Sequence, residues 1–325
     1  MSKGKTSIMS PSVVMRKKPD IKTRMHILQL GCKKYKGLLL MLIPGIAWFL
    51  IFKYYPMYGV TIAFKDYKLL KGIMGSPWTG LDHFIRLFNS SQFESVFWNT
   101  LIIGIYRLVF SFPAPILFAI LLNEIRHERY KKAIQSITYL PHFISWVVIA
   151  GLLQTILSPV DGVVNYVFQA FGLGPYKFLM MPGLFRGIVI GSGIWKDMGW
   201  GSIVYLAAIT GIDPQIYEAA TMDGVTRLKK IWYITVPSIF PVIITMFLMK
   251  VGNIMEGGRD QILNLYNPIV YSVGDILDTY SYRVGLLDFD YSYSTAISLF
   301  QNVIGLIFLY ITNFITKRVS DQGLW

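Results

Sequence analysis

The residues best able to do chemistry in this chain are a few charged side chains inside long apolar segments. Arg107, Lys196 and Lys250 are the cations of this set, and Asp197 and Glu256 are its acids. A charge inside a membrane-spanning segment is costly, and by default it lines a transport pathway or is paired. We therefore treat Arg107, Lys196 and Lys250 as candidates for a solute pathway. The open alternative for Lys196 with Asp197, and for Lys250 with Glu256, is an internal pair or a contact with a neighbouring subunit.

Cations outnumber acids in and beside the apolar segments, five against two. Lys53 and Arg186 complete the cationic set, and we interpret both as structural because long side chains near a segment end can extend to lipid headgroups. A pathway with this bias favours an anionic solute. A neutral solute remains the alternative.

No set of residues with catalytic or metal-binding spacing accompanies these charges. Cys32 is the single cysteine, which excludes an internal disulfide and a thiolate metal cluster, and the four histidines are scattered. The stretch GKTS at residues 4–7 resembles the end of a phosphate-binding loop, but the required preceding glycine and strand are missing. We expect no catalytic residues, no metal site and no nucleotide site in this chain.

Composition indicates an integral membrane protein. The 325 residues are 54% hydrophobic and 15% charged, and six apolar segments are about 20 residues long, as membrane-spanning helices require. They cover residues 37–58, 97–122, 137–157, 183–208, 238–256 and 294–316. The predicted fold is therefore an all-α membrane protein with six transmembrane helices.

Lysine and arginine predict the orientation. The intervals 1–36, 123–136, 209–237 and 317–325 hold 19 of them, whereas 59–96, 158–182 and 257–293 hold seven. Positive charge accumulates on the cytoplasmic side, so both termini are expected to be cytoplasmic. The predicted organisation is a basic segment 1–36, a membrane domain 37–316 and a tail 317–325. The net charge of +13 is explained in this way, and nucleic-acid binding is not expected.

The polar interval 209–237 is the most distinctive part of the chain. Asp213 and Pro214 are typical of a helix start, and Asp223 with Gly224 is typical of a helix end. We expect a second short helix over 226–234, with Pro237 at the beginning of the fifth span. An amphipathic loop on lipid headgroups and a surface that receives another protein are both compatible with this pattern.

The spacing in this interval resembles the signature loop of permeases from bacterial ATP-binding-cassette importers. The matching positions are Glu218, Ala219, Ala220, Gly224, Ile234 and Pro237, while Val236 stands where leucine is usual. The segments KYYPMYGVTIAFKDY and ITYLPHFISWVVIAGL are similar to the LplB-type permeases for oligosaccharides and polysaccharides. The resemblance covers nearly the whole chain and implies a type I, maltose-transporter-like importer subunit.

The resemblance implies a set of partners. The chain would lie in the bacterial inner membrane beside a second, homologous permease subunit, with two ATPase subunits and an external solute-binding protein. The loop 209–237, including Asp223, would be the coupling helix that docks on an ATPase. ATP and Mg would be bound by the ATPases, and the chain itself would bind no cofactor.

The implied substrate is an oligosaccharide or polysaccharide. Because of the cation excess we expect it to be acidic and to contain uronate, with a neutral oligosaccharide as the alternative. Trp146, Trp195 and Trp200 are candidates for stacking on sugar rings. Gly191, Gly193, Gly199 and Gly201 flank the last two and would permit close helix approach. A membrane-embedded enzyme is the competing class, but neither paired carboxylates nor an H-E-x-x-H helix is present.

Overall fold

The computed structural model describes residues 34–320, and these residues are almost entirely helical. Within them no β-strand is present, and β-type pairing is limited to one isolated bridge between Lys65 and Trp78. The all-α prediction is therefore confirmed for this part of the chain. Most of the predicted basic segment 1–36, and the last five residues of the tail, lie outside the described residues.

The chain divides into two compact units, Met1–Gly59 and Val60–Trp325. In the first unit, α2 (Lys36–Phe49) continues through the π turn η1 (Leu50–Tyr54) into α3 (Tyr55–Met57). None of these elements contains a buried residue. Such an apolar and exposed helix agrees with a segment whose solvent is lipid.

The second unit contains five long helical segments. They are α6, η4 and α7 (Ser91–Tyr106, Arg107–Ser111, Pro113–Asn123); α8, η5 and α9 (Glu128–Tyr139, Leu140–Phe143, Trp146–Ile156); α11 (Pro182–Thr210); α13, η7 and α14 (Arg227–Lys230, Ile231–Thr235, Val236–Gly252); and α18 (Tyr291–Ser320). The short helix α12 (Pro214–Met222) follows α11.

The remaining elements are short and join the long segments. Before α6 lie η2 (Tyr58–Phe64), η3 (Leu69–Lys71), α4 (Gly72–Gly75) and α5 (Asp82–Phe88). Between α9 and α11 lie α10 (Val163–Ala170) and η6 (Phe178–Met180). Between α14 and α18 lie α15 (Arg259–Leu265), η8 (Pro268–Val270), α16 (Tyr271–Gly274), α17 (Leu277–Tyr282) and η9 (Arg283–Leu287).

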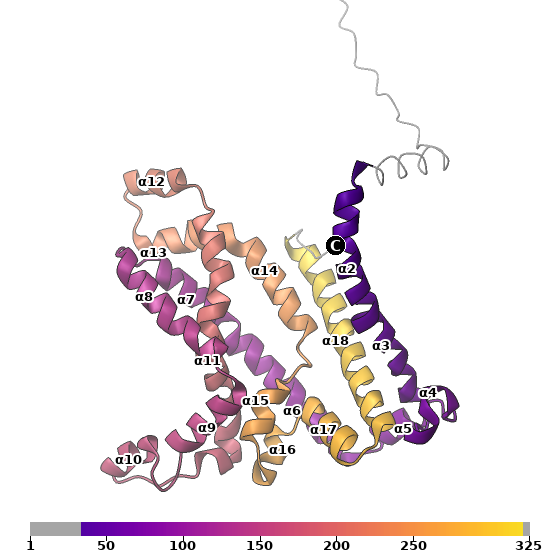
Figure 1. The fold of residues 1–325 in the computed structure, drawn as a ribbon. Coiled ribbons are helices and arrows are strands. Elements are labelled where there is room, and N and C mark those ends of the chain that lie inside the picture. Colours follow the sequence, from indigo (N-terminus) through magenta and orange to yellow (C-terminus); the bar gives the residue numbers. More distant parts are fainter. Residues whose placement is uncertain (1–33, 321–325) are drawn as a thin grey trace, which may run out of the picture. The chain divides into compact units, whose positions relative to one another are not determined.

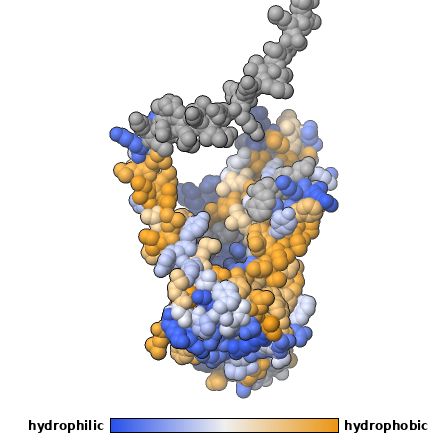
Figure 2. Space-filling view, turned by 90° about the vertical axis from the view of Figure 1, so that its right-hand side faces the viewer, coloured by the Kyte–Doolittle hydropathy of each residue, from blue (hydrophilic) through white to orange (hydrophobic). Residues whose placement is uncertain are grey.

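Within the second unit, the polar elements gather at two opposite ends. Figure 1 places α12 and α13 at one end, and α5, α10 and α16 at the other. Figure 2 shows a hydrophilic band across the lower end and apolar surface above it. Within this lower end, we call residues 257–293, with the parts of α6 and α11 packed on them, the outer cap. The arrangement is that of a membrane domain whose polar interval 209–237 lies on the face away from the outer cap.

Four helical segments are long and apolar enough to cross a membrane, or five if a bent pair is counted as one span. The four are Lys36–Phe64, Ser91–Asn123, Arg227–Gly252 and Tyr291–Arg318. The helix α11 coincides with the predicted span 183–208 and has 29 residues, but it is less apolar because Arg186, Lys196 and Asp197 interrupt it. The predicted fifth span ends at Gly252, so Glu256 lies beyond it.

The predicted span 137–157 is not one straight helix. Its two halves, Glu128–Phe143 and Trp146–Ile156, meet at 102°. Pro141 lies in η5, and Ser145 starts α9 by accepting a hydrogen bond from the amide of Val148. A proline followed by a serine cap stops one helix and begins another. The segment is therefore a bent pair of helices, the form of a broken span or of a re-entrant loop.

In three long segments, a π turn lies immediately before a proline. The π turns η1, η4 and η7 each end two residues before a proline, at Pro56, Pro113 and Pro237. Proline has no N–H for the ladder and its ring crowds the carbonyl four residues earlier. A π turn changes the hydrogen-bond register at this point, so the helix continues past the proline. Pro237 lies in the first turn of α14, as predicted, and the apolar helical segment extends back from it through η7 to Arg227.

The helices α11 and α8 make a close backbone contact. A Cβ atom added at Gly199 would lie 2.2 Å from the carbonyl oxygen of Thr138. The backbones therefore meet where one helix has no side chain, as small residues allow in membrane helices. Gly191, on the same helix, has no atom within 4 Å of an added Cβ.

We expect Gly199→Ala to destabilise the protein, because a methyl group here forces α8 and α11 apart. Overpacking of this kind costs about 1–3 kcal/mol. Thermal unfolding in detergent, followed by the fluorescence of buried groups, should show a lower midpoint than the wild type. Gly191→Ala is the matched control and should leave the midpoint unchanged or raise it. Equal midpoints for Gly199→Ala and the wild type would contradict the close contact.

Candidate functional site

The interval between α11 and α14 forms a defined protein surface. The helix α12 starts as predicted, because the Asp213 carboxylate accepts a hydrogen bond of 2.9 Å from the amide of Gln215 and Pro214 occupies the first turn. The cap satisfies a backbone N–H that has no partner within the helix. The three residues Gly211–Asp213 that separate α11 from α12 make the connection short.

The helix α12 ends in a Schellman motif, and this motif explains the spacing between the alanines and the glycine. The amide of Val225 donates to the carbonyl of Ala220 at 3.0 Å, and the amide of Gly224 donates to Thr221 at 3.1 Å. Gly224 has a φ of 71°, which is the left-handed conformation that glycine adopts without a Cβ penalty. The motif therefore requires a glycine four residues after Ala220.

Two side-chain contacts hold α12 against the beginning of the next span. The hydroxyl of Tyr217 lies 2.8 Å from that of Thr235, and the Lys230 ammonium donates to the Thr221 hydroxyl at 2.6 Å. The second helix that we expected over 226–234 is continuous with α14 through η7. A displacement of α12 would thus reach both α11 and α14.

The outward face of this interval carries large apolar side chains together with charge. Glu218 and Ala219 are exposed and Ala220 is half-buried. Met222 is 89% exposed, and Leu228, Trp232 and Tyr233 are 70%, 67% and 78% exposed. Exposed apolar side chains at the end of a membrane domain are compatible with contact to another protein and with contact to lipid. Of the remaining predicted coupling residues, Asp223 caps α12 and is exposed, Ile234 is half-buried, and Pro237 is exposed.

The exposed aromatic and aliphatic residues of this surface were not among the predicted coupling residues. The signal was present, because Met222, Leu228, Trp232 and Tyr233 are large apolar residues within a polar interval. We define the coupling surface as the exposed residues of 213–233.

A polar cleft opens between the break before α9, the α15 region and α18. Its volume is about 430 Å³, and it is lined by Trp146, Glu256, Gly258, Arg259, Asp260, Gln261, Asp278, Ser298, Gln301 and Asn302. Trp146 is the predicted sugar-stacking residue that reaches it. The other lining groups are mostly hydrogen-bonding side chains, which is the chemistry that a sugar ring requires.

Arg107 lies on the π turn η4 and points toward the outer cap. Its guanidinium donates to Gln261 Oε1 at 2.7 Å and to the carbonyl of Glu256 at 3.5 Å. A Cβ added at Gly258 would lie 2.4 Å from its Nη2. Arg107 therefore fixes the backbone beneath the cleft.

Lys196 is not paired with Asp197, so the proposed internal pair was wrong. Its side chain is only 7% exposed, and its ammonium donates to the carbonyls of Pro141, His142 and Ile144. Asp197 instead accepts from His142 Nδ1 at 2.9 Å. Because the Lys196 ammonium donates to three backbone carbonyls, it has no donor left for a solute.

The two tryptophans of α11 have different surroundings. Trp200 stacks on His142 at 4.8 Å between ring centroids, and it meets Phe143 edge to face at 5.3 Å. Its role is therefore to pack the break between α8 and α9. Trp195 is 49% exposed and remains accessible.

Lys250 and Glu256 are both exposed, and no ion pair joins them within the described residues. Lys250 lies in the last turn of α14. A lysine near a helix end can extend to the interface. The internal pair that we considered for these residues was wrong, and Lys250 stays a predicted pathway residue.

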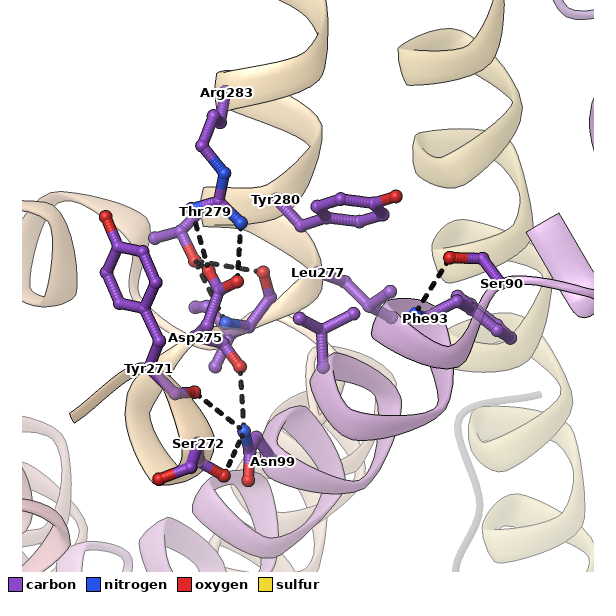
Figure 3. A network of polar contacts seen from close by, with 12 residues as sticks. Ser90, Phe93, Asn99, Tyr271, Ser272, Asp275, Leu277, Thr279, Tyr280 and Arg283 are labelled. Carbon is purple, nitrogen blue, oxygen red and sulfur yellow. Dashed lines mark hydrogen bonds and ion pairs between the residues drawn. The ribbon is translucent and has the colours of Figure 1, made fainter. Parts of the chain in front are cut away.

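The outer cap contains a buried polar network that was not predicted from the sequence. Asp275 is 2% exposed, and it accepts hydrogen bonds from Arg283 at 2.6 Å and Thr279 at 2.8 Å. Asn99 of α6 donates to the carbonyls of Ser272 and Asp275, each at 3.1 Å (Figure 3). No motif connects these positions, because they meet only through tertiary packing.

Two arginines complete this network. Burial alone lowers the pKa of Arg283, but the hydrogen bond and negative charge of Asp275 outweigh it, so the pKa lies above its usual value. Arg186 donates to Asn99 Oδ1 at 2.7 Å and to the carbonyl of Val273 at 3.1 Å. Arg186 is therefore structural, as predicted, but through the network and not by extending to lipid.

No group of three or more histidine, cysteine, aspartate or glutamate side chains that could hold a metal ion occurs in residues 34–320. Residues 111–321 match the family described as "Binding-protein-dependent transport system inner membrane component". The matched region includes α11, the coupling surface and α14.

The chain belongs to this family. It is a transport component and not an enzyme, and it is a multi-pass protein of the bacterial inner membrane. The permease resembles known proteins over most of its length, beyond the matched region.

Two curated relatives come from Bacillus subtilis (strain 168). The "polygalacturonan/rhamnogalacturonan transport system permease protein YteP" is 43% identical over 89% of the permease and 90% of its own length. "Protein LplB" is 41% identical over 90% of the permease and 92% of its own length. The predicted resemblance to LplB-type permeases is thereby confirmed.

A solved structure agrees with the relatives. It is titled "bacterial alginate ABC transporter in complex with alginate pentasaccharide-bound periplasmic protein", and one of its chains aligns with a TM-score of 0.84 at 43% identity. The alignment covers 91% of the permease and 99% of that chain.

Proposed function

We propose that the permease is one of two membrane subunits of an ATP-driven importer for acidic oligosaccharides or polysaccharides that contain uronate. The observation that carries the proposal is the likeness, over nine-tenths of the chain, to a permease of an alginate transporter. The polygalacturonan/rhamnogalacturonan relative supports the same substrate class. An external binding protein would deliver the sugar to the outer cap.

The coupling surface supports the assignment of the ATPase as its partner. It is apolar at Met222 and Trp232, it carries the charge of Glu218, and it lies at the end of the second unit away from the outer cap. A second, homologous permease subunit and two ATPases would complete the complex. ATP and Mg would be bound by the ATPases, and the permease would supply no cofactor site.

Six spans with both termini in the cytoplasm are part of the proposal. Four long helices, the bent pair of α8 and α9, and α11 make six crossings if the bent pair and α11 each cross once. The lysine and arginine distribution then places the coupling surface in the cytoplasm. In this arrangement the outer cap and the coupling surface lie on opposite sides of the membrane.

The cation excess of the apolar segments does not support the acidic substrate in the way we expected. Lys196 and Arg186 are engaged by backbone carbonyls, and Arg107 is engaged by Gln261. The cleft itself contains Glu256, Asp260 and Asp278 against Arg259. The support for uronate therefore comes from the relatives, and recognition within the cleft would rest on hydrogen bonds and on Trp146.

The test is the ATPase activity of the reconstituted complex, with its own ATPases, partner permease and binding protein, against neutral and uronic oligosaccharides of equal length. We expect stimulation of at least about tenfold by uronic members and little by neutral ones, since a mismatched charge at a desolvated site costs a few kcal/mol. Stimulation by neutral sugars alone would replace the acidic substrate by a neutral one. Chemical conversion of the sugar by the permease without the ATPases would contradict the proposal that it is an importer subunit.

A further inference from the structure

We propose that Lys196 is a positioning residue that transmits movement of the coupling helix to the cleft, through the break between α8 and α9. The proposal rests on the proposed function, because it assigns a mechanical role within the same importer. Lys196 is a buried cation, and neither contact with a solute nor an ion pair explains why a charge is buried at this position.

The number of N–H donors on the Lys196 ammonium equals the number of carbonyls that it meets at the bend between α8 and α9. The last carbonyls of a helix lose their partners within it, although that of Pro141 also accepts from the amide of Ile144 at 3.2 Å, and Ile144 follows η5 in an extended conformation. In a membrane interior each unsatisfied group costs several kcal/mol. Lys196 has three N–H donors, and they meet three carbonyls, those of Pro141, His142 and Ile144. The positive charge also complements the negative end of the helix dipole.

The same side chain reaches the wall of the cleft. The Lys196 ammonium lies 5.5 Å from the ring of Trp146, and Trp146 lines the cleft. Trp146 is the first residue of α9, and the bend of 102° begins immediately before it. The direction of α9 and the place of this ring are thus set by carbonyls that Lys196 holds.

The neighbouring residues of α11 make the connection stiff. Asp197 accepts from His142, and Trp200 stacks on the same imidazole. Gly199 brings the two backbones together at Thr138. Within one and a half turns, α11 therefore fastens the last turn of α8 and η5 by hydrogen bonds, stacking and backbone contact.

The helix α11 runs without interruption from this junction to the coupling surface. Lys196 precedes its last residue, Thr210, by 14 positions, which is about 21 Å along the axis. Only Gly211–Asp213 then separate α11 from α12. A rotation or shift of α12 moves α11 as a rigid rod, and Lys196 conveys this movement to α9 and Trp146.

The first experiment compares Lys196→Met, Lys196→Gln and Lys196→Arg in the complete complex. We expect Lys196→Met to lower the maximal ATPase rate with loaded binding protein by about tenfold, in the range of coupling changes caused by residues between two sites. The concentration of binding protein for half-maximal stimulation should stay within about twofold, because docking at the outer cap is unchanged. Lys196→Arg, which keeps charge and donors, should restore more activity than Lys196→Gln.

A labelling experiment measures the movement directly. In a Cys32→Ser background, which removes the single cysteine of the chain, Val147→Cys places a reporter on α9 at a position that is 65% exposed. Mass spectrometry of the labelled peptide gives its rate of modification without nucleotide and in the vanadate-trapped state. We expect a change of about threefold or more with Lys196 present, and no change with Lys196→Met.

The control is Lys53→Met, which removes an exposed lysine from another apolar helical segment. It should leave both the ATPase rate and the labelling response as in the wild type. An equal labelling response in Lys196→Met and the wild type, or no response in the wild type, would overturn the positioning role. A wild-type response without uptake of uronic sugar would leave this role intact and overturn only the substrate assignment.

Discussion

Gly224→Pro is expected to reduce sugar uptake by at least about a hundredfold while the permease remains in the membrane. Proline holds φ near −65° and has no N–H, whereas Gly224 has a φ of 71° and donates to Thr221 at 3.1 Å. The Schellman motif at the end of α12 cannot form. The coupling surface then loses its orientation, although every apolar span is unchanged.

Uptake into proteoliposomes, the amount of permease in the membrane and the amount of co-purified ATPase are the three measurements. Glu218→Lys should lower uptake by about tenfold, since a reversed charge at a protein interface disfavours association. Wild-type uptake in both variants would contradict the coupling role of residues 213–233.

Two alanine variants distinguish the effect of the left-handed backbone conformation at Gly224 from the effect of replacing any glycine in this interval. Gly224→Ala forces a side chain into the left-handed region at a cost of about 1–2 kcal/mol. Gly211, in the same interval, has a φ of −82°, and a Cβ added there would lie 3.5 Å from the nearest atom, so Gly211→Ala is the control. We expect uptake to fall for Gly224→Ala and to stay near the wild-type rate for Gly211→Ala.

Arg283→Met is expected to cause the largest loss of stability, about 3 kcal/mol or more. Removal of one partner from a buried ion pair leaves an uncompensated charge, which costs about 3–5 kcal/mol. The Asp275 side chain is 3% exposed and that of Arg283 is 20% exposed. Without Arg283, the Asp275 carboxylate keeps only the hydroxyl donor of Thr279.

Thermal unfolding and limited proteolysis of the outer cap provide the measurements for this variant. The midpoint should fall, and cleavage within residues 257–293 should occur before cleavage elsewhere. Lys68→Met is the matched control, because it breaks an exposed pair with Asp66 in which the two side chains are 56% and 46% exposed. Such pairs contribute about 0–1 kcal/mol. Equal midpoints for Arg283→Met and Lys68→Met would show that the buried pair does not stabilise the cap.

The features that the sequence predicted well are those encoded in local chemistry. The apolar segments predicted the long helices, and Asp213, Pro214 and Gly224 predicted both ends of α12, because caps and left-handed glycines act within a few residues. The family was recognised for the same reason, since its signature lies in one short loop.

The features that the sequence did not predict depend on tertiary contacts. Lys196 stands next to Asp197, and the neighbouring charges suggested a pair, but consecutive residues on a helix point in different directions. Their partners lie on η5, more than 50 residues earlier in the chain. Asn99 and Asp275 are likewise ordinary polar residues in sequence, and they become a network only when α6 packs against the outer cap.

The π turn η4 changes how positions along the helical segment Ser91–Asn123 must be counted. Successive residues of an α-helix turn by about 100°, and a π turn contains one residue more than an α turn. Side chains after Ser111 are therefore displaced by about 100° from the face that counting from Ser91 assigns to them. Arg107 meets Gln261 of the outer cap, whereas Pro115 meets Gly201 of α11. A helical wheel drawn through this segment in one register would place one of these two contacts on the wrong side.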